Sequence, residues 1–253
     1  MKTFLTVVAA VTLLVSARAF AHGGMVDLSV YDRTEGRRLS VYWHEGRAWI
    51  AGRPGNEYQV TLRNRQSQDV LAIVSVDGVN VITGQTADPS QSGYVLSPRG
   101  GVDILGWRKS LAQTAAFYFT ALPDSYAART GRPDDVGVIG VAVFRRKVQP
   151  VPLPQPYSQQ APAAAEARRE RSDAASGARA MEDRLGTGHG RQEYSPATQV
   201  TFERATSSPT EIITLYYDSH ANLVARGIIR EPIGVAPLPQ PRPFPGFVPD
   251  PRS

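Results

Sequence analysis

A histidine close to the start of the chain is the residue whose position could carry chemistry. His22 follows two overlapping small-x-small tripeptides, 17–19 and 19–21, which are typical of signal-peptide cleavage sites. Cleavage after Ala21 would make His22 the amino-terminal residue, and a terminal amine and an imidazole together can bind copper. Cleavage after Ala19 would leave Phe20 and Ala21 ahead of the histidine and prevent that geometry.

A copper site of this kind needs a second histidine. His44 and His220 are the candidates, although each falls in a predicted tight turn, and His189 lies in a glycine-rich stretch. We therefore keep copper binding, or copper-dependent oxidation, as the alternative hypothesis. The favoured interpretation is an incidental histidine near a chain end, with no resident cofactor.

A tryptophan and three arginines form the second candidate site: Trp107, Arg108, Arg129 and Arg132. A tryptophan ring can stack on a sugar or cover an apolar ligand, and a guanidinium group can hold a carboxylate or phosphate through two parallel hydrogen bonds. The competing interpretation, which we favour, buries the tryptophan in the core. Arg129 and Arg132 would then pin their own loop to nearby aspartates.

Sequence motifs of hydrolases and nucleotide-binding proteins are missing. The chain has no Gly-x-Ser-x-Gly, no His-Glu-x-x-His and no Gly-x-x-x-x-Gly-Lys segment. Its aspartates beside turns are explained by turn and capping hydrogen bonds: Asp77, Asp103 and Asp124. A catalytic triad assembled in space would escape such a search, but we expect a protein without catalytic activity.

Residues 1–21 predict export. Lys2 precedes an apolar run over residues 4–15, and the small-residue cleavage sites follow, which is the pattern of a secretory signal peptide. The run is shorter than a membrane helix needs, about 18 apolar residues, and no later segment reaches that length. The chain has 0 cysteines, which excludes disulfides and a lipoprotein anchor. We expect a periplasmic or secreted protein without an integral membrane segment in the mature chain.

The charge pattern gives little support for nucleic-acid binding. The net charge is +5 and falls to +3 when Lys2 and Arg18 leave with the signal peptide. A surface that binds nucleic acid would concentrate its basic residues on one element. Here the arginines are spread along the chain, so we expect no nucleic-acid partner.

Residues 22–148 have the pattern of an all-β domain. Short apolar or alternating segments are separated by Gly, Pro, Asn and Asp, which is typical of an antiparallel sandwich or flattened barrel. The predicted strands are 25–31, 39–43, 48–51, 58–63, 70–76, 79–83, 93–96, 102–107, 114–122 and 136–144, the last apolar on both faces and therefore central. Residues 39–51 and 70–83 each predict a hairpin, the second through its Asp77-Gly78 turn, and 124–133 predict a single helical turn.

The rest of the chain divides into three parts. Residues 149–197 hold a proline-rich spacer and an Ala/Arg-rich segment that we expect to be partly helical or disordered, followed by a flexible glycine-rich link over 186–190. Residues 198–230 predict a three-stranded meander, with strands over 198–204, 211–217 and 223–230, that docks onto the first domain. Residues 231–253 form a proline-rich tail.

Several short stretches resemble a group of uncharacterised exported bacterial proteins. They are residues 74–84, 106–108, 115–117, 128–133 and 136–144, with 202–204 and 217–219 further along. The resemblance implies a periplasmic or secreted protein with no established activity, and it carries over no catalytic residue. We therefore expect a non-catalytic binding or scaffolding protein of the cell envelope. Its partner would be an envelope protein or a glycan, in contact with edge strands or with the tail.

Overall fold

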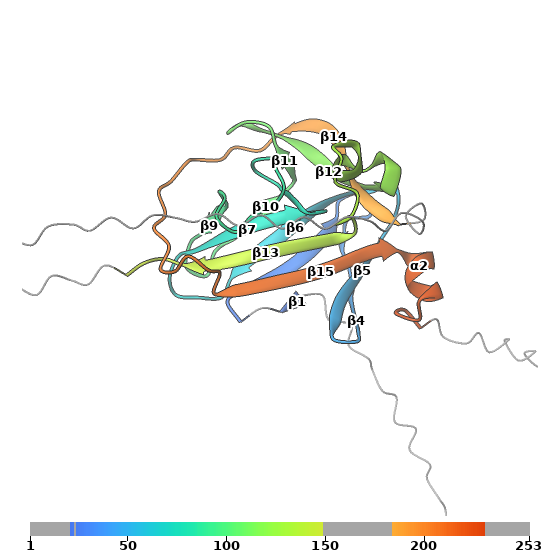
Figure 1. The fold of residues 1–253 in the computed structure, drawn as a ribbon, viewed down its shortest axis with the longest axis horizontal. Coiled ribbons are helices and arrows are strands. Elements are labelled where there is room, and N and C mark those ends of the chain that lie inside the picture. Colours follow the sequence, from blue (N-terminus) through green and yellow to red (C-terminus); the bar gives the residue numbers. More distant parts are fainter. Residues whose placement is uncertain (1–20, 23, 149–183, 231–253) are drawn as a thin grey trace, which may run out of the picture.

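Two β-sheets packed face to face make up the fold. The computed structural model describes residues 21–22, 24–148 and 184–230, and these residues form one sheet of eight strands and one of seven (Figure 1). Neither sheet closes into a barrel within this part of the chain. The all-β sandwich predicted from the strand spacing is therefore confirmed.

The eight-stranded sheet runs in the order β1-β2-β6-β12-β11, with β3 on β2, β10 on β6 and β14 on β12. All of its strand pairs are antiparallel. The strands are β1 (Ala21–His22), β2 (Val26–Asp32), β3 (Arg37–Arg38), β6 (Glu57–Asn64), β10 (Gly101–Ile104), β11 (Gly106–Arg108), β12 (Gln113–Ala121) and β14 (Leu185–Tyr194).

The seven-stranded sheet runs in the order β4-β5-β15-β13-β7-β8, with β9 on β7. Only the β5 and β15 pair is parallel among the pairs described for this sheet. The strands are β4 (Val41–His44), β5 (Arg47–Gly52), β7 (Val70–Val76), β8 (Val79–Asn80), β9 (Tyr94–Leu96), β13 (Val138–Arg145) and β15 (Glu211–Ser219). The helices are short: η1 (Leu122–Asp124), α1 (Tyr126–Arg129) and α2 (His220–Ala225).

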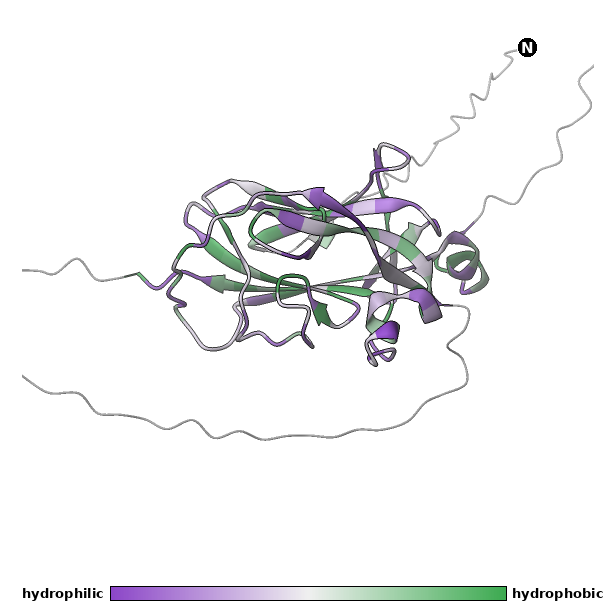
Figure 2. Cartoon of the chain, turned by 90° about the horizontal axis from the view of Figure 1, so that it is seen from above, coloured by the Kyte–Doolittle hydropathy of each residue, from purple (hydrophilic) through white to green (hydrophobic). Residues whose placement is uncertain are grey.

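Alternating side chains decide which face of each strand enters the core. On β6 the alternate residues Tyr58, Val60 and Leu62 are fully buried, because they face the opposite sheet. The apolar strand β13 lies between β7 and β15, as its sequence predicts. Figure 2 shows hydrophobic residues concentrated in the strands of both layers and hydrophilic residues in the loops. The buried cluster between the sheets supplies the main stabilisation of the fold.

The local turn predictions are confirmed. β4 and β5 form the first predicted hairpin, and β7 and β8 form the second. In the second turn Asp77 and Gly78 both have positive φ, 52° and 70°, which is the backbone that a two-residue hairpin turn requires. The single helical turn predicted before Gly131 is α1, capped by the Ser125 side chain.

The three-stranded meander predicted for 198–230 is wrong. β15 is its only strand, residues 198–204 form no strand apart from an isolated bridge at Arg204, and α2 begins at His220. The predicted glycine-rich link is instead part of β14, which pairs with β12 in the other sheet. The C-terminal part of the chain therefore contributes β14 to the eight-stranded sheet and β15 to the seven-stranded sheet. It is an integral part of the sandwich and not a separate unit docked onto it.

The glycines of β14 explain why the sequence conceals this strand. A Cβ on Gly188 would lie 2.2 Å from Cζ of Tyr118, its cross-strand neighbour, so the tyrosine ring occupies the space of the missing side chain. A strand is predicted from the alternation of apolar and polar side chains, and glycines contribute no side chain to that pattern. The covering ring comes from a distant segment that no local pattern identifies.

Four predictions lie outside the described residues: the signal peptide predicted over 1–21, all but its last residue, the proline-rich spacer, the Ala/Arg-rich segment up to 183, and the tail over 231–253. In the part of the chain that the structure describes, no helix has both the length and the apolar character needed to cross a membrane.

Candidate functional site

Trp107, the aromatic member of the candidate set from the sequence, belongs to the core. Its side chain is buried, its indole N–H donates to the carbonyl of Gly188 at 3.1 Å, and its ring meets Phe117 edge-on with centroids 5.1 Å apart. The ring is therefore not a surface for ligand stacking. The geometry supports the competing interpretation, in which this tryptophan is a core residue.

The arginines of that set lie on different elements: Arg108 ends β11, Arg129 ends α1, and Arg132 lies in the loop that follows α1. Arg108 donates to the carbonyl of Ser195, and Arg132 donates to the carbonyl of Gly84 at 3.2 Å and to Thr130 Oγ1 at 2.8 Å. The loop partners of Arg132 are thus carbonyl and hydroxyl oxygens, where the sequence suggested aspartates. Arg129 is exposed. None of the candidate residues Trp107, Arg108, Arg129 and Arg132 lines either of the two clefts described below.

The histidines are placed on different elements. His22 lies in β1 opposite Asp27, His44 ends β4 with Nε2 3.8 Å from Glu45 Oε1, and His220 is the first residue of α2. Within the described residues, no group of three or more His, Cys, Asp or Glu side chains could hold a metal ion.

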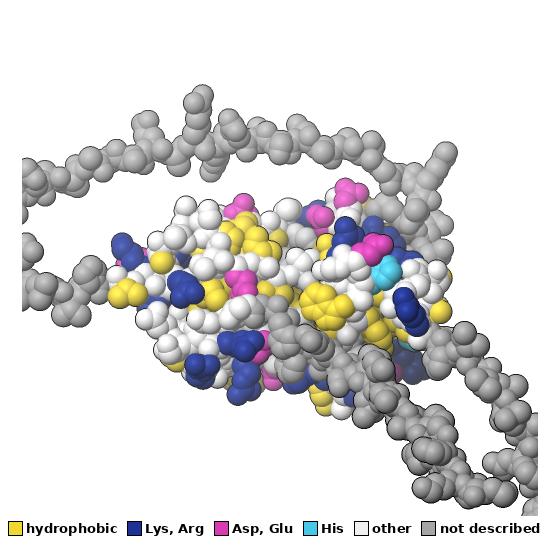
Figure 3. Space-filling view, turned by 90° about the horizontal axis from the view of Figure 1, so that it is seen from below, with side chains coloured by type: hydrophobic (Ala, Val, Ile, Leu, Met, Phe, Trp, Pro, Cys, Tyr) yellow, Lys and Arg dark blue, Asp and Glu magenta, His cyan; other side chains and the backbone are white. Residues whose placement is uncertain are grey.

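A cleft with a volume of about 610 Å³ lies beside α2. Five segments line it: the start of β5, the loop before β13, the start of β14, the end of β15, and α2. A smaller cleft of about 320 Å³ adjoins it and shares Arg47, Trp49 and Arg226. On the face shown in Figure 3, basic, acidic and hydrophobic side chains are interspersed, and a histidine lies beside acidic and basic side chains toward one end.

Two arginines and two aromatic rings form a continuous row in this cleft, which we call the Arg-aromatic row. Cζ of Arg47 lies 5.6 Å from the ring centroid of Tyr216, and the Tyr216 ring stacks on Trp49 with centroids 4.9 Å apart. Cζ of Arg226 lies 4.4 Å from the Trp49 ring. The ring faces attract both cations and restrict their positions. The two guanidinium groups are thereby held at the cleft with much of their hydrogen-bonding capacity unused.

The polar groups around the row are unevenly satisfied. Arg226 approaches Asp218 only at 3.6 Å, while Asp218 Oδ1 accepts from Asn222 Nδ2 at 2.8 Å. Within the described ranges Arg47 has no ion-pair partner, and the indole N–H of the buried Trp49 has no hydrogen-bond acceptor. A buried donor without an acceptor costs free energy. Arg47 and Arg226 therefore present guanidinium donors that a ligand in the cleft could satisfy, whereas the Trp49 N–H is buried.

Two further acidic side chains line the cleft. Asp134 and Asp135 are exposed in the loop before β13, and Arg184 fixes that loop by donating to the carbonyl of Val136 at 2.7 Å. Carboxylates accept hydrogen bonds from hydroxyl groups. The cleft thus combines cationic donors on β5 and α2 with anionic acceptors on the loop.

A buried carboxylate lies behind the wall of the cleft. Asp77 is fully buried, and its Oδ1 accepts from the backbone N–H of Gly137 at 2.9 Å and from the Tyr217 hydroxyl at 2.5 Å. Its Oδ2 accepts from the backbone N–H of Thr187 at 2.8 Å. Burial raises the pKa of Asp77 to about 6, and the hydrogen bonds from Tyr217, Gly137 and Thr187 offset part of that rise.

Hydroxyl groups continue this network across the core. The Thr187 hydroxyl lies 2.6 Å from the hydroxyl of Tyr217 and 2.6 Å from that of Tyr58. Burial, followed by the nearby charge of Asp77, raises the pKa of both tyrosines. The network joins β6 and β14 of one sheet to β15 and the β7–β8 turn of the other. Tyr217 and Gly137 also line the cleft, so this hydrogen-bond network fixes the position of the cleft wall.

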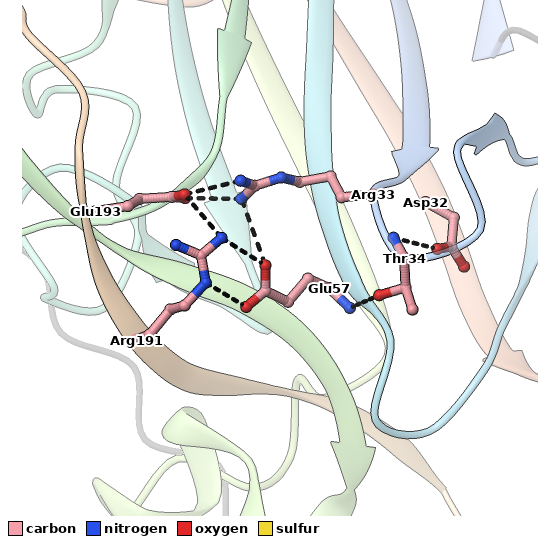
Figure 4. A network of polar contacts seen from close by, with 6 residues as sticks. All are labelled: Asp32, Arg33, Thr34, Glu57, Arg191 and Glu193. Atoms are coloured by element: carbon pink, nitrogen blue, oxygen red, sulfur yellow. Dashed lines mark hydrogen bonds and ion pairs between the residues drawn. The ribbon is translucent and has the colours of Figure 1, made fainter.

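A second polar network fixes the outer half of β14 (Figure 4). Arg33 donates to both carboxylate oxygens of Glu193, at 2.7 and 2.8 Å, and Arg191 donates to both oxygens of Glu57, at 2.8 and 2.9 Å. Arg191 also approaches Glu193 at 3.3 Å. Charges alternate around the group and every member has an opposite partner. We therefore interpret it as a structural link between β14 and the first strands of the chain.

Comparisons of the chain with models of protein families, with curated proteins and with solved structures find no match. The class that the fold defines is a two-sheet β-sandwich. Function must therefore be inferred from the cleft itself.

Sequence reasoning missed every residue of the Arg-aromatic row. Tyr217-Asp218-Ser219 belongs to the stretches quoted for the resemblance, and Asp77 was noted only as a turn residue. An aspartate in a hairpin turn is ordinarily exposed, and here the loop before β13 and strand β14 cover it. No local pattern indicates that cover.

Proposed function

We propose that this chain is an exported, non-catalytic binding protein of the bacterial cell envelope, and that its ligand is an acidic saccharide bound in the cleft beside α2. The single observation that carries the proposal is the Arg-aromatic row. Its two guanidinium groups are held by ring faces, and Arg47 keeps its N–H groups free of ion pairs within the described residues.

The chemistry of the row favours a carboxylate. A guanidinium group offers parallel N–H donors that match the two oxygens of a carboxylate, and such charge-assisted bonds are among the stronger hydrogen bonds in proteins. Ring contacts restrict Arg47 and Arg226 before the ligand arrives, so less conformational freedom is lost on binding.

The rest of the cleft favours a sugar over a simple anion. Asp134 and Asp135 supply acceptors for hydroxyl groups, and a volume of about 610 Å³ lies within the usual range of ligand sites. A saccharide that carries a carboxylate would engage both the arginines and the aspartates that line the cleft. A small inorganic anion would use the arginines alone.

Calorimetric titration of the purified protein tests this proposal. The acidic probe is trigalacturonate and the neutral control is maltotriose. We expect binding of the first and none of the second, and Arg47→Ala should weaken binding at least about tenfold, the effect of losing one charge-assisted contact. Arg129→Ala is the matched control, because Arg129 is also exposed and does not line the cleft.

Three outcomes would overturn the proposal. They are equal affinity for both probes, no affinity for the acidic probe, and a loss of affinity in Arg129→Ala that Arg47→Ala does not show. Circular dichroism of each variant confirms that its fold is retained.

A further inference from the structure

The smaller cleft is formed by the β4–β5 hairpin and the segment that follows α2. Four lining residues come from the hairpin and two follow the helix: His44, Glu45, Arg47 and Trp49, then Arg226 and Ile228. In the turn between β4 and β5, Glu45 and Gly46 have positive φ, 48° and 74°, as a two-residue hairpin turn requires. The hairpin is therefore tightly closed, and it fixes the backbone that carries His44 and Glu45.

Two arginines mark the boundary between the smaller and the larger cleft, because Arg47 and Arg226 line both. A guanidinium group carries five N–H donors in one plane. Arg226 uses part of this capacity at 3.6 Å from Asp218, which lines only the larger cleft. A ligand that occupies both clefts passes these two arginines, and its carboxylate would be bound there.

Carboxylates line each cleft beyond this boundary. Asp134, Asp135 and Asp218 line only the larger cleft, and Glu45 lines only the smaller one. Arg184 adds a cation to the larger cleft, where the three carboxylates outnumber it. Like charges repel, so further anionic groups on the ligand would be disfavoured on either side of the bound carboxylate. The charge pattern of the two clefts therefore fits a ligand with one central negative charge.

The smaller cleft also has groups that suit an uncharged sugar. Nε2 of His44 lies 3.8 Å from Oε1 of Glu45, which is longer than a hydrogen bond, so both groups can bind sugar hydroxyls. Ile228 supplies apolar surface for the C–H groups of a sugar ring. The volume of about 320 Å³ is at the lower end of the usual range for ligand sites, so this cleft suits a short part of a longer ligand.

We propose that the two clefts form one continuous site for an acidic oligosaccharide in which a single uronic acid unit lies between uncharged sugar units. The carboxylate is bound at the boundary by Arg47 and Arg226. One uncharged neighbour lies in the larger cleft near the aspartates, and the other lies in the smaller cleft near His44 and Glu45. The inference rests on the proposed binding of an acidic saccharide and adds the length and charge pattern of that ligand.

Calorimetric titration of the purified protein at low salt compares three probes. They are glucuronate alone, a trisaccharide of glucuronate between two N-acetylglucosamine units, and trigalacturonate, which carries a carboxylate on every unit. We expect the mixed trisaccharide to bind at least about tenfold more tightly than glucuronate, because it occupies both clefts. It should bind about fivefold more tightly than trigalacturonate, because its outer units bring no charge near the acidic side chains.

The outcomes separate this inference from the proposed function. If glucuronate binds as tightly as the mixed trisaccharide, the clefts are not one continuous site. If trigalacturonate binds as tightly as the mixed trisaccharide, or more tightly, the charge pattern is wrong. In both cases binding of an acidic saccharide stands. If none of the three probes binds, the proposed function and this inference are both overturned.

Glu45→Gln tests the charge of the smaller cleft through a gain of affinity. The substitution removes a negative charge and keeps the size of the side chain, so trigalacturonate should bind about threefold more tightly and the mixed trisaccharide should be unaffected. Glu203→Gln is the matched control, because it changes the net charge equally and lines neither cleft. The same gain in both variants, or none in Glu45→Gln, would contradict the assigned position of Glu45.

His44→Ala tests whether the ligand reaches the smaller cleft. Loss of one hydrogen bond should weaken binding of the mixed trisaccharide about threefold or more. His220→Ala is the control, because His220 is exposed on α2 and lines neither cleft. Circular dichroism checks that both variants are folded. An unchanged affinity in folded His44→Ala would overturn the continuous site.

Discussion

The hydroxyl of Tyr217 donates a hydrogen bond of 2.5 Å to the carboxylate of Asp77 in the interior of the sandwich. Tyr217 lies in β15, the last strand, whereas Asp77 occupies the turn between β7 and β8. This contact joins the returning C-terminal part of the chain to a hairpin of the first part. It also stands directly behind the cleft that we propose as the binding site, because Tyr217 lines that cleft.

Stability should depend on pH through Asp77. The folded pKa of about 6 lies above the reference value of 3.8, so between these values the folded state binds the proton and the unfolded state releases it. The contribution of Asp77 is therefore most favourable below about pH 4 and is lost as the pH rises through about 6. The difference between these two pKa values corresponds to a loss of about 3 kcal/mol in the free energy of unfolding.

The comparison with Asp77→Asn isolates this effect from the other carboxylates. Asparagine tolerates the positive φ of 52° at this position. Urea unfolding at several pH values should show the stability of the natural protein falling by about 3 kcal/mol relative to the variant between pH 4 and pH 7. A constant difference across that range would contradict the assignment.

Removal of the Tyr217 hydroxyl should destabilise the fold. Tyr217→Phe keeps the ring but deprives Asp77 of a donor and the Thr187 hydroxyl of a partner, so we expect a loss of about 1–3 kcal/mol in urea unfolding. Tyr216→Phe is the control on the adjacent position, whose ring stacking on Trp49 is unchanged. Equal effects of the two substitutions would show that the buried network contributes nothing of its own.

Gly106 should tolerate no side chain. A Cβ at this position would lie 1.9 Å from the carbonyl oxygen of Ala115 on β12, and a backbone atom cannot move aside without disturbing the sheet. We expect Gly106→Ala to cost about 2–3 kcal/mol, measured as a lower thermal midpoint. Gly24→Ala is the control, because its nearest neighbour would be 3.6 Å away. A near-neutral Gly106→Ala would show that β11 shifts freely.

The charge network on β14 should stabilise the fold in a salt-dependent manner. Glu193, whose side chain is only 9% exposed, contacts both Arg33 and Arg191, so Glu193→Gln should cost about 1–3 kcal/mol. Glu203→Gln breaks the Lys147 pair, in which both side chains are more than half exposed, and should cost less than about 1 kcal/mol. Denaturant unfolding at low and high salt measures the free energy of unfolding of both variants. Similar losses in Glu193→Gln and Glu203→Gln would contradict a special role for Glu193.

Most strands of the first part were predictable because their signal is local. β6 alternates, β13 is apolar on both faces, and the Asp77-Gly78 turn specifies its hairpin through backbone conformation. The competing interpretation of Trp107 also followed from general preferences for burial. β14 was missed because three of its residues are glycines, and the second half of α2 was taken for a strand because the helix is only 6 residues long.

The sequence by itself determined an all-β chain with its turns, because side-chain alternation and backbone preference act over neighbouring residues. Only the tertiary structure decided that β14 and β15 complete opposite sheets, that Asp77 is buried, and that Arg47, Trp49, Tyr216 and Arg226 form one row. These relationships join segments far apart in the chain. They depend on which strand pairs with which, and that choice is made by the packing of the whole core.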